Sequence, residues 1–253
     1  MASDIQQAPF VKELAANGIL CPPNQSSHHS QVVDRPTRDR AVQSLRTFLS
    51  GRRELPALEL LKLWKGLFYC MWMSDRPRTQ QALADSLADL VSVLPQGTVI
   101  PFLRAYWQTM QREWTNIDVL RMEKFLLLTR RYLGATFQVL QRGDWEEALV
   151  REHVDLLEEI PCNVEDMRIP NGMRFHVIDI YVDELERAGA LESEEERHLD
   201  VLLEPLRKLT KESPTKPVRT KAKEALEDER LPGNEKAEEH PPQEDEDWDG
   251  IED

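Results

Sequence analysis

Helix-starting residues recur about every 20 residues through the first half of this 253-residue chain. Candidate starts lie near residues 36, 56, 77, 98 and 117, and each is followed by apolar residues at intervals of three and four. No segment alternates apolar and polar residues between hairpin turns, as a half-buried strand would. The spacing therefore predicts an all-α protein in which helical hairpins recur about every 40 residues, close to the period of HEAT-type repeats.

We expect nine helices, over residues 9–17, 36–50, 56–73, 77–94, 98–114, 117–142, 144–160, 173–188 and 193–210. Antiparallel hairpins of this kind stack as an irregular HEAT-like solenoid. Because successive pairs share no matching residues, an irregular up-and-down bundle stays open. The helix that begins at Pro56 is apolar around its whole circumference from Gly66 onward, which predicts a central position.

A single all-helical domain is expected over residues 1–211, with a flexible loop at about residues 21–34. Residues 212–253 are poor in apolar side chains and rich in charge and proline, which predicts a disordered tail with at most one short helix near Val218–Arg230. Residues 224–253 hold 14 acidic and two basic side chains, against a net charge of -14 for the whole chain. The body is therefore nearly neutral, and the tail is acidic from residue 224.

Three widely spaced cysteines, Cys21, Cys70 and Cys162, fit neither a disulfide framework nor a CxxC zinc or redox pair. The amino terminus has the features of neither a signal peptide nor a transit peptide. The most apolar stretch, residues 58–73, includes three charged side chains and is shorter than the ~20 residues that span a bilayer. These observations predict a protein of the cytosol or nucleus that contacts no membrane.

No sequence motif of a nucleotide-binding loop, serine hydrolase, metalloprotease or kinase is present. His176, Asp179 and Asp183 share one helical face, which fits either a metal or acid–base site or, more commonly, a hydrogen-bonded structural pair. We therefore expect no catalytic residue, metal, cofactor or small-molecule substrate. Helical spacing predicts that most tryptophans pack in the core and do not serve as base-stacking platforms. These tryptophans are Trp64, Trp72, Trp107, Trp114 and Trp145.

Basic residues gather where alternating helices would bring three segments to one edge. These segments are the start of the helix near residue 36 and the turns near residues 75 and 116. The candidate RNA- or partner-binding residues at this edge are Arg35, Arg38, Arg40, Arg76, Arg78, Arg112 and Arg121. Five carboxylates lie nearby in the sequence, so a solvated rim of salt bridges is the alternative.

Four segments of the chain resemble the nucleolar ribosomal RNA processing protein 1 family. They are residues 38–45, the segment LLKLWKGLFYCMWMSD at 60–75, the segment AYWQTMQREWTNID at 105–118, and Pro170-Asn171-Gly172 followed by His176 and residues 179–185. Together they extend over roughly residues 9–210, nearly all of the expected fold.

The resemblance implies a non-catalytic assembly factor of the nucleolus that acts in maturation of the large ribosomal subunit and in processing of its precursor RNA. The implied partners are the large-subunit precursor particle, other assembly factors and pre-ribosomal RNA. Several members of the family carry a long basic carboxy-terminal extension, whereas this sequence becomes acidic after a short basic run at residues 211–223. A helical adaptor that binds only proteins is the alternative function.

Overall fold

The computed structural model describes residues 35–51, 54–192 and 196–234. These residues form α-helices and two short 3-10 helices with no strand, which confirms the all-α class. The α-helices are α3 (Arg35–Ser50), α4 (Ala57–Trp72), α5 (Pro77–Ala88), α6 (Gln96–Glu113), α7 (Val119–Arg142), α8 (Glu147–Glu159), α9 (Asn171–Arg187), α10 (Glu196–Leu202), α11 (Glu204–Glu212) and α12 (Lys216–Leu226). The 3-10 helices η1 (Asp89–Val93) and η2 (Trp114–Asn116) follow α5 and α6. The helix and the loop expected at residues 9–17 and 21–34 lie outside the described residues.

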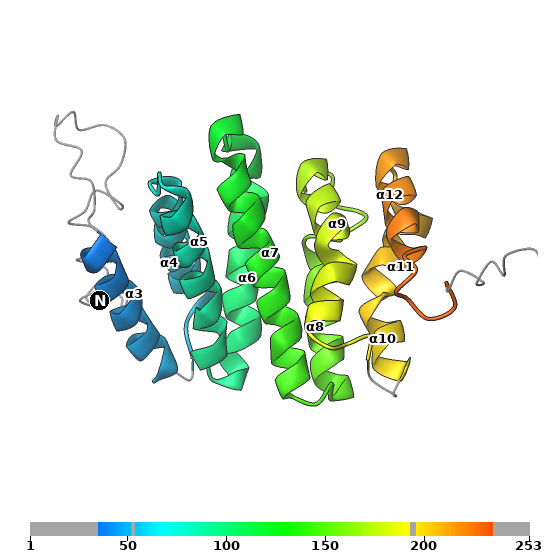
Figure 1. The fold of residues 1–253 in the computed structure, drawn as a ribbon, viewed down its shortest axis with the longest axis horizontal. Helices are drawn as coiled ribbons and strands as arrows, with labels where there is room; N and C mark the ends of the chain where they lie inside the picture. The colour runs from blue at the N-terminus through cyan, green and yellow to red at the C-terminus, as the bar shows by residue number, and fades with distance from the viewer. Residues whose placement is uncertain (1–34, 52–53, 193–195, 235–253) are drawn as a thin grey trace, which may run out of the picture.

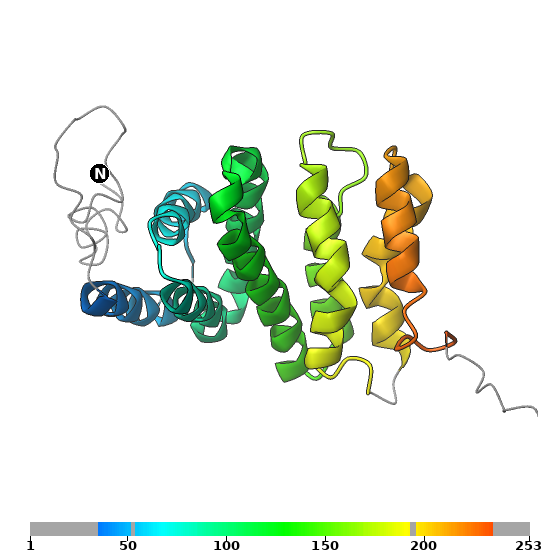
Figure 2. The same ribbon diagram turned by 45° about the horizontal axis from the view of Figure 1, so that its top comes forward.

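The helices stack side by side in chain order as two layers (Figure 1). One layer packs α4, α6 and α8 in succession and continues with α10 and α11. The other packs α5, α7, α9 and α12, while α3 lies against α5 and η1 at one end. Figure 2 shows α4 and α5 inclined to the helices that follow, so the stack twists along its length. Apart from α10 and α11, which follow one another in the same direction, successive α-helices run in opposite directions, as expected for stacked hairpins. The HEAT-like assignment itself stays a prediction.

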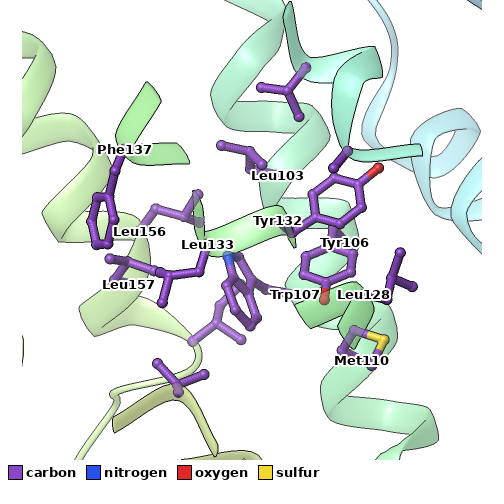
Figure 3. Packing of buried hydrophobic residues seen from close by; sticks show 14 of the residues in the cluster. Leu103, Tyr106, Trp107, Met110, Leu128, Tyr132, Leu133, Phe137, Leu156 and Leu157 are labelled. Atoms are coloured by element: carbon purple, nitrogen blue, oxygen red, sulfur yellow. The ribbon is translucent and has the colours of Figure 1, made fainter. Parts of the chain in front are cut away.

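The core between the two layers is built from large apolar and aromatic side chains (Figure 3). Tyr106 on α6 stacks on Tyr132 of α7 with ring centroids 4.2 Å apart. Trp64 of α4 meets both rings edge-on, and its Nε1 donates to the carbonyl oxygen of Phe102 at 3.0 Å. Burial of such aromatic side chains is a main stabilising contribution to a helical stack.

Two expectations about the helices need correction. The helix expected to be central, α4, lies near one end of the described stack and exposes Tyr69, and Met73 is exposed directly after its end. Its uniformly apolar sequence does not distinguish a helix buried on all sides from one with an exposed apolar stripe. The single helix expected at residues 193–210 is two helices, because Pro205 lies in the first turn of α11 and cannot continue the hydrogen bonding of α10.

The expected domain boundary at residue 211 falls inside α11, and the packed structure continues to Asn234. The short helix expected near Val218–Arg230 is α12, which packs on α9 and α11 and buries Val218 and Ala222 completely. These residues lie four apart on one face, and a composition averaged over the segment hides so short a stripe. Residues 235–253, the rest of the expected disordered tail, lie outside the described residues.

Candidate interaction edge

Three turns lie at one edge of the stack, the upper edge in Figure 1. They join α4 to α5, α6 to α7 and α8 to α9, and the start of α3 lies at the same edge. We call the surface formed by residues 73–78, 112–121 and 161–172 the turn edge. All three later segments of the sequence resemblance reach this surface.

Lys124 of α7 joins the α4–α5 turn to the next hairpin. Its side chain is 4% exposed, and its Nζ donates to the carbonyl oxygens of Trp72 at 2.5 Å and Ser74 at 2.8 Å. The last carbonyls of a helix have no partner within the helix, so this ammonium group satisfies the end of α4. Burial, together with the nearby Arg121, lowers the pKa of Lys124 to about 8.

Trp72 and Arg121 form a second contact between the same two turns. The guanidinium carbon of Arg121 lies 4.9 Å from the centre of the half-buried Trp72 ring, a cation–π distance. Arg121 also pairs with Asp118, whose side chain accepts from the backbone NH of Arg121 and so caps α7.

Arg174 holds the α8–α9 loop in place. Its guanidinium group donates to the carbonyl oxygens of Asn163 at 2.7 Å, Asp166 at 2.8 Å and Ile169 at 2.9 Å. The planar group offers several NH donors in fixed directions, so one buried side chain can satisfy three successive parts of a loop. The α8–α9 loop therefore has a defined shape at the surface.

The α6–α7 turn is joined to this loop. Gln111 of α6 donates to the carboxylate of Asp166 at 3.2 Å. A Cβ atom added to Gly172 would lie 3.1 Å from Nε1 of Trp114. Because glycine has no side chain, α9 can begin close to the indole ring of Trp114, the first residue of η2. The three turns therefore form one continuous surface held by polar and aromatic contacts.

The predicted basic residues have different environments on this surface. The side chains of Arg76 and Arg78 are exposed and have no hydrogen-bond or ion-pair partner among the described residues. Arg112 pairs with Glu113 at 2.7 Å, and Arg121 pairs with Asp118, so the salt-bridge alternative applies to these two. Arg40 is exposed near the start of α3. Arg35 and Arg38 lie in the first turn of α3, where the backbone alone is described.

The turn edge also carries exposed apolar side chains, which the sequence did not lead us to expect. Val119 and Leu120 in the first turn of α7 are 87% and 94% exposed, Met167 in the α8–α9 loop is 69% exposed, and Met73 in the α4–α5 turn is 58% exposed. The periodicity that predicts core positions also includes such residues. They differ from core residues only in position, because they lie in turns or in a first helical turn, where no neighbouring helix covers their side chains.

The residues considered for a metal or acid–base site are engaged in structural contacts. His176 Nε2 lies 2.8 Å from the carbonyl oxygen of Leu126, and burial lowers the pKa of this histidine, so a neutral ring donates there. Asp179 pairs with Lys221, and Asp183 pairs with Arg130 at 2.9 Å and Arg230 at 3.0 Å. These contacts join α9 to α7 and to the segment around α12. Within the described ranges, no group of His, Cys, Asp or Glu is arranged to hold a metal ion.

The tryptophans are mostly structural, as predicted. Trp64, Trp107 and Trp114 are buried. Trp72 and Trp145 are half-buried, and Trp145 stacks on the ring of His198 with centroids 5.0 Å apart. The described part of the chain contains no helix long and apolar enough to cross a membrane.

The sequence matches the family model described as nucleolar protein Nop52 over residues 31–252. It is 45% identical to the human ribosomal RNA processing protein 1 homolog B over 162 residues, which are 61% of this chain and 21% of that protein. It is 42% identical to the human homolog A over 170 residues, or 64% of this chain and 36% of that protein.

A more distant relative, the ribosomal RNA processing protein 1 homolog of Drosophila melanogaster, is 32% identical over 195 residues. These are 73% of this chain and 25% of that protein, so the chain spans well under half the length of the relatives it matches. The family match extends over most of the chain and includes the turn edge. The chain therefore belongs to the Nop52 nucleolar-protein family, the family of the ribosomal RNA processing protein 1 homologs that its sequence resembles.

Proposed function

We propose that this protein is a non-catalytic assembly factor in the processing of ribosomal RNA and in biogenesis of the large ribosomal subunit. It acts in the nucleolus as a helical scaffold on precursor particles, among other assembly factors. Its membership of a family described as nucleolar, and relatives named for ribosomal RNA processing, support this proposal.

One observation supports the turn edge as the docking surface. The segments that carry the family resemblance belong to different hairpins, yet residues 72–75, 111–118 and 170–172 meet there. Lys124 and Gln111 join neighbouring turns through hydrogen bonds, and Arg174 fixes the α8–α9 loop. A surface fixed in this way is suited to recognition, because little conformational entropy is lost on binding.

The function is tested by expressing the tagged full-length protein in cells and sedimenting the cell extract through a gradient. The expected result is cosedimentation with large-subunit precursors, together with accumulation of large-subunit precursor RNA when the protein is depleted. Small-subunit precursor RNA is the internal control. A protein that stays at the top of the gradient, with precursor RNA unchanged on depletion, would exclude the proposal.

Direct contact with RNA is the part of the proposal that concerns the basic residues. Crosslinking of RNA in cells tests it: large-subunit precursor RNA joined to peptides that contain residues 35–40, 76–78 or 112–121 would support direct contact. The alternative is an adaptor that binds proteins alone, and the pairing of Arg112 and Arg121 with their own carboxylates favours it. Phosphate contacts weaken steeply with added salt, whereas apolar contacts do not, so the salt dependence of binding separates the two.

A further inference from the structure

The described part of the chain exposes six large apolar side chains, and four of them lie on the turn edge. The other two, Leu58 and Tyr69, are on α4. Single exposed apolar residues are ordinary on a protein surface, whereas a group of them on one surface marks an interaction site. Val119 and Leu120 are adjacent, and both are almost fully exposed in the first turn of α7.

The charged groups on the same surface are largely paired with one another. Arg112 binds Glu113, Arg121 binds Asp118 and lies on Trp72, and Arg168 binds Asp166 through two nitrogen atoms at 2.9 Å. A nucleic-acid backbone would have to displace these carboxylates, and it would gain nothing from Val119, Leu120 or Met167. A surface whose charges are mostly paired with one another, and which carries several apolar anchors, fits a protein partner better than a phosphate backbone.

The unpaired charges give the surface a direction. Beside Met73 at the α5 end, the exposed side chains of Arg76 and Arg78 have no ion-pair partner in the described ranges, and they outnumber the one exposed carboxylate there, Asp75. Glu165, beside Met167 at the α8–α9 end, is exposed, and its carboxylate forms no hydrogen bond or ion pair within the described ranges. A bound segment with carboxylates at one end is therefore favoured in one orientation, with that end at Arg76 and Arg78.

We infer that the turn edge binds an amphipathic segment of a partner protein, with apolar side chains on Leu120 and Met167 and carboxylates at Arg76 and Arg78. Packed helices are about 10 Å apart, so three successive hairpins span about 20 Å, the length of a helix of about 13 residues. The inference rests on the proposed function for its setting, since the partner is expected within the precursor particle.

The chain itself contains a competing segment, EDEDWDGIED at residues 244–253, which combines acidic residues with Trp248 and Ile251. We nevertheless assign the site to a partner, because the carboxylates of this segment lie on both sides of Trp248 and Ile251, so one group of them would lie beside Glu165. Binding of the chain's own carboxy-terminal segment is one outcome of the test below.

The test places a photo-crosslinking amino acid at Leu120 of the full-length chain in cells and identifies the crosslinked peptides. The matched control is the same amino acid at Leu58, which is 62% exposed but lies in the first turn of α4, at the opposite edge. We expect Leu120, and not Leu58, to crosslink to one partner segment in which apolar residues are followed by carboxylates. Crosslinks to RNA, to residues 244–253 of the same chain, or to nothing would overturn the inference.

Substitutions then test the orientation. Leu120→Glu should weaken binding of that segment about tenfold or more without changing the melting temperature, and Leu58→Glu should leave binding unchanged. Arg76→Glu with Arg78→Glu should weaken it comparably, and replacing the partner's carboxylates by lysine should restore binding. Absence of restoration would contradict the proposed direction.

The same experiments distinguish the two proposals. If wild-type protein does not sediment with precursor particles, yet Leu120 crosslinks to such a segment, the proposed function fails and the binding surface stands. If the protein sediments with the particles in both its wild-type and Leu120→Glu forms, and Leu120 crosslinks to nothing, the surface fails and the function stands.

Discussion

The Nζ atom of Lys124 lies 2.8 Å from the carbonyl oxygen of Ser74, so a residue of α7 closes the turn that follows α4. Ser74 O also accepts from Nε2 of Gln80 at 2.8 Å. The position of the α4–α5 turn thus depends on a side chain from the next hairpin. This contact explains how a surface built from separate hairpins keeps one shape.

We expect Lys124→Met to lower the free energy of unfolding by about 1–3 kcal/mol, because two buried carbonyl groups lose a charged donor. Urea denaturation measures this change. Lys65→Met is the control, since Lys65 is exposed on α4, and it should change stability by less than about 0.5 kcal/mol. Equal stability of the two variants would show that water replaces the ammonium group without cost.

The same residue predicts a pH dependence. Its pKa in the folded protein, about 8, is below its ordinary value of 10.5, so between these values the unfolded chain binds more protons than the folded one. The free energy of unfolding therefore rises with pH over that window. Below pH 8 the buried ammonium group is charged, and its destabilising effect on the fold is fully present. We expect the difference in unfolding free energy between wild type and Lys124→Met to change in favour of wild type from pH 8 upward. A difference that is flat with pH would contradict this assignment.

Gly134 and Gly97 predict opposite effects of the same substitution. A Cβ atom at Gly134 would lie 2.5 Å from Oε2 of Glu184, a buried carboxylate that binds Arg130 at 2.6 Å. Gly134→Ala should therefore destabilise the fold by about 1–3 kcal/mol. At Gly97 in α6 a Cβ atom meets nothing within 4 Å, so Gly97→Ala should stabilise by up to about 1 kcal/mol. Thermal unfolding of the two variants tests the pair, and a shift in the same direction would contradict it.

We expect Arg174→Lys to loosen the α8–α9 loop, because an ammonium group cannot reach three carbonyl groups in the directions that a guanidinium group offers. The expected loss is about 2–3 kcal/mol, with faster hydrogen exchange confined to residues 163–170. Arg168→Lys, at an exposed position in the same loop, is the control and should leave exchange there unchanged. Exchange that is slow in both variants would show that the loop is held by other contacts.

Most of the helices could be predicted from sequence because their apolar stripes and stop signals agree. Residues 119–142, for example, form one helix that ends at Gly143. The helix start expected at Asp144 is wrong, since Asp144 and Trp145 adopt positive φ values and Glu146 caps α8. Positive φ at two non-glycine residues is uncommon, so local sequence gives little sign of it.

The turn edge could be predicted in part. Alternating helix directions place the turns at one edge, and this requires no knowledge of side chains. The roles of Lys124 and Arg174 could not be predicted, because lysine and arginine are normally exposed and each binds carbonyl groups that only the tertiary fold brings near. The exposure of Leu120 could not be predicted either, since its position continues the helical stripe of α7.

Neighbours in the stack are also neighbours along the chain, from α3 at one end to α12 at the other. Each hairpin can therefore pack onto completed structure as soon as it has been synthesised, without waiting for a distant segment. The Lys124 contact is formed only when α7 is present, so the α4–α5 turn is completed one hairpin later than its own helices. The order of synthesis is thus the order in which the fold, and then its turn edge, can be assembled.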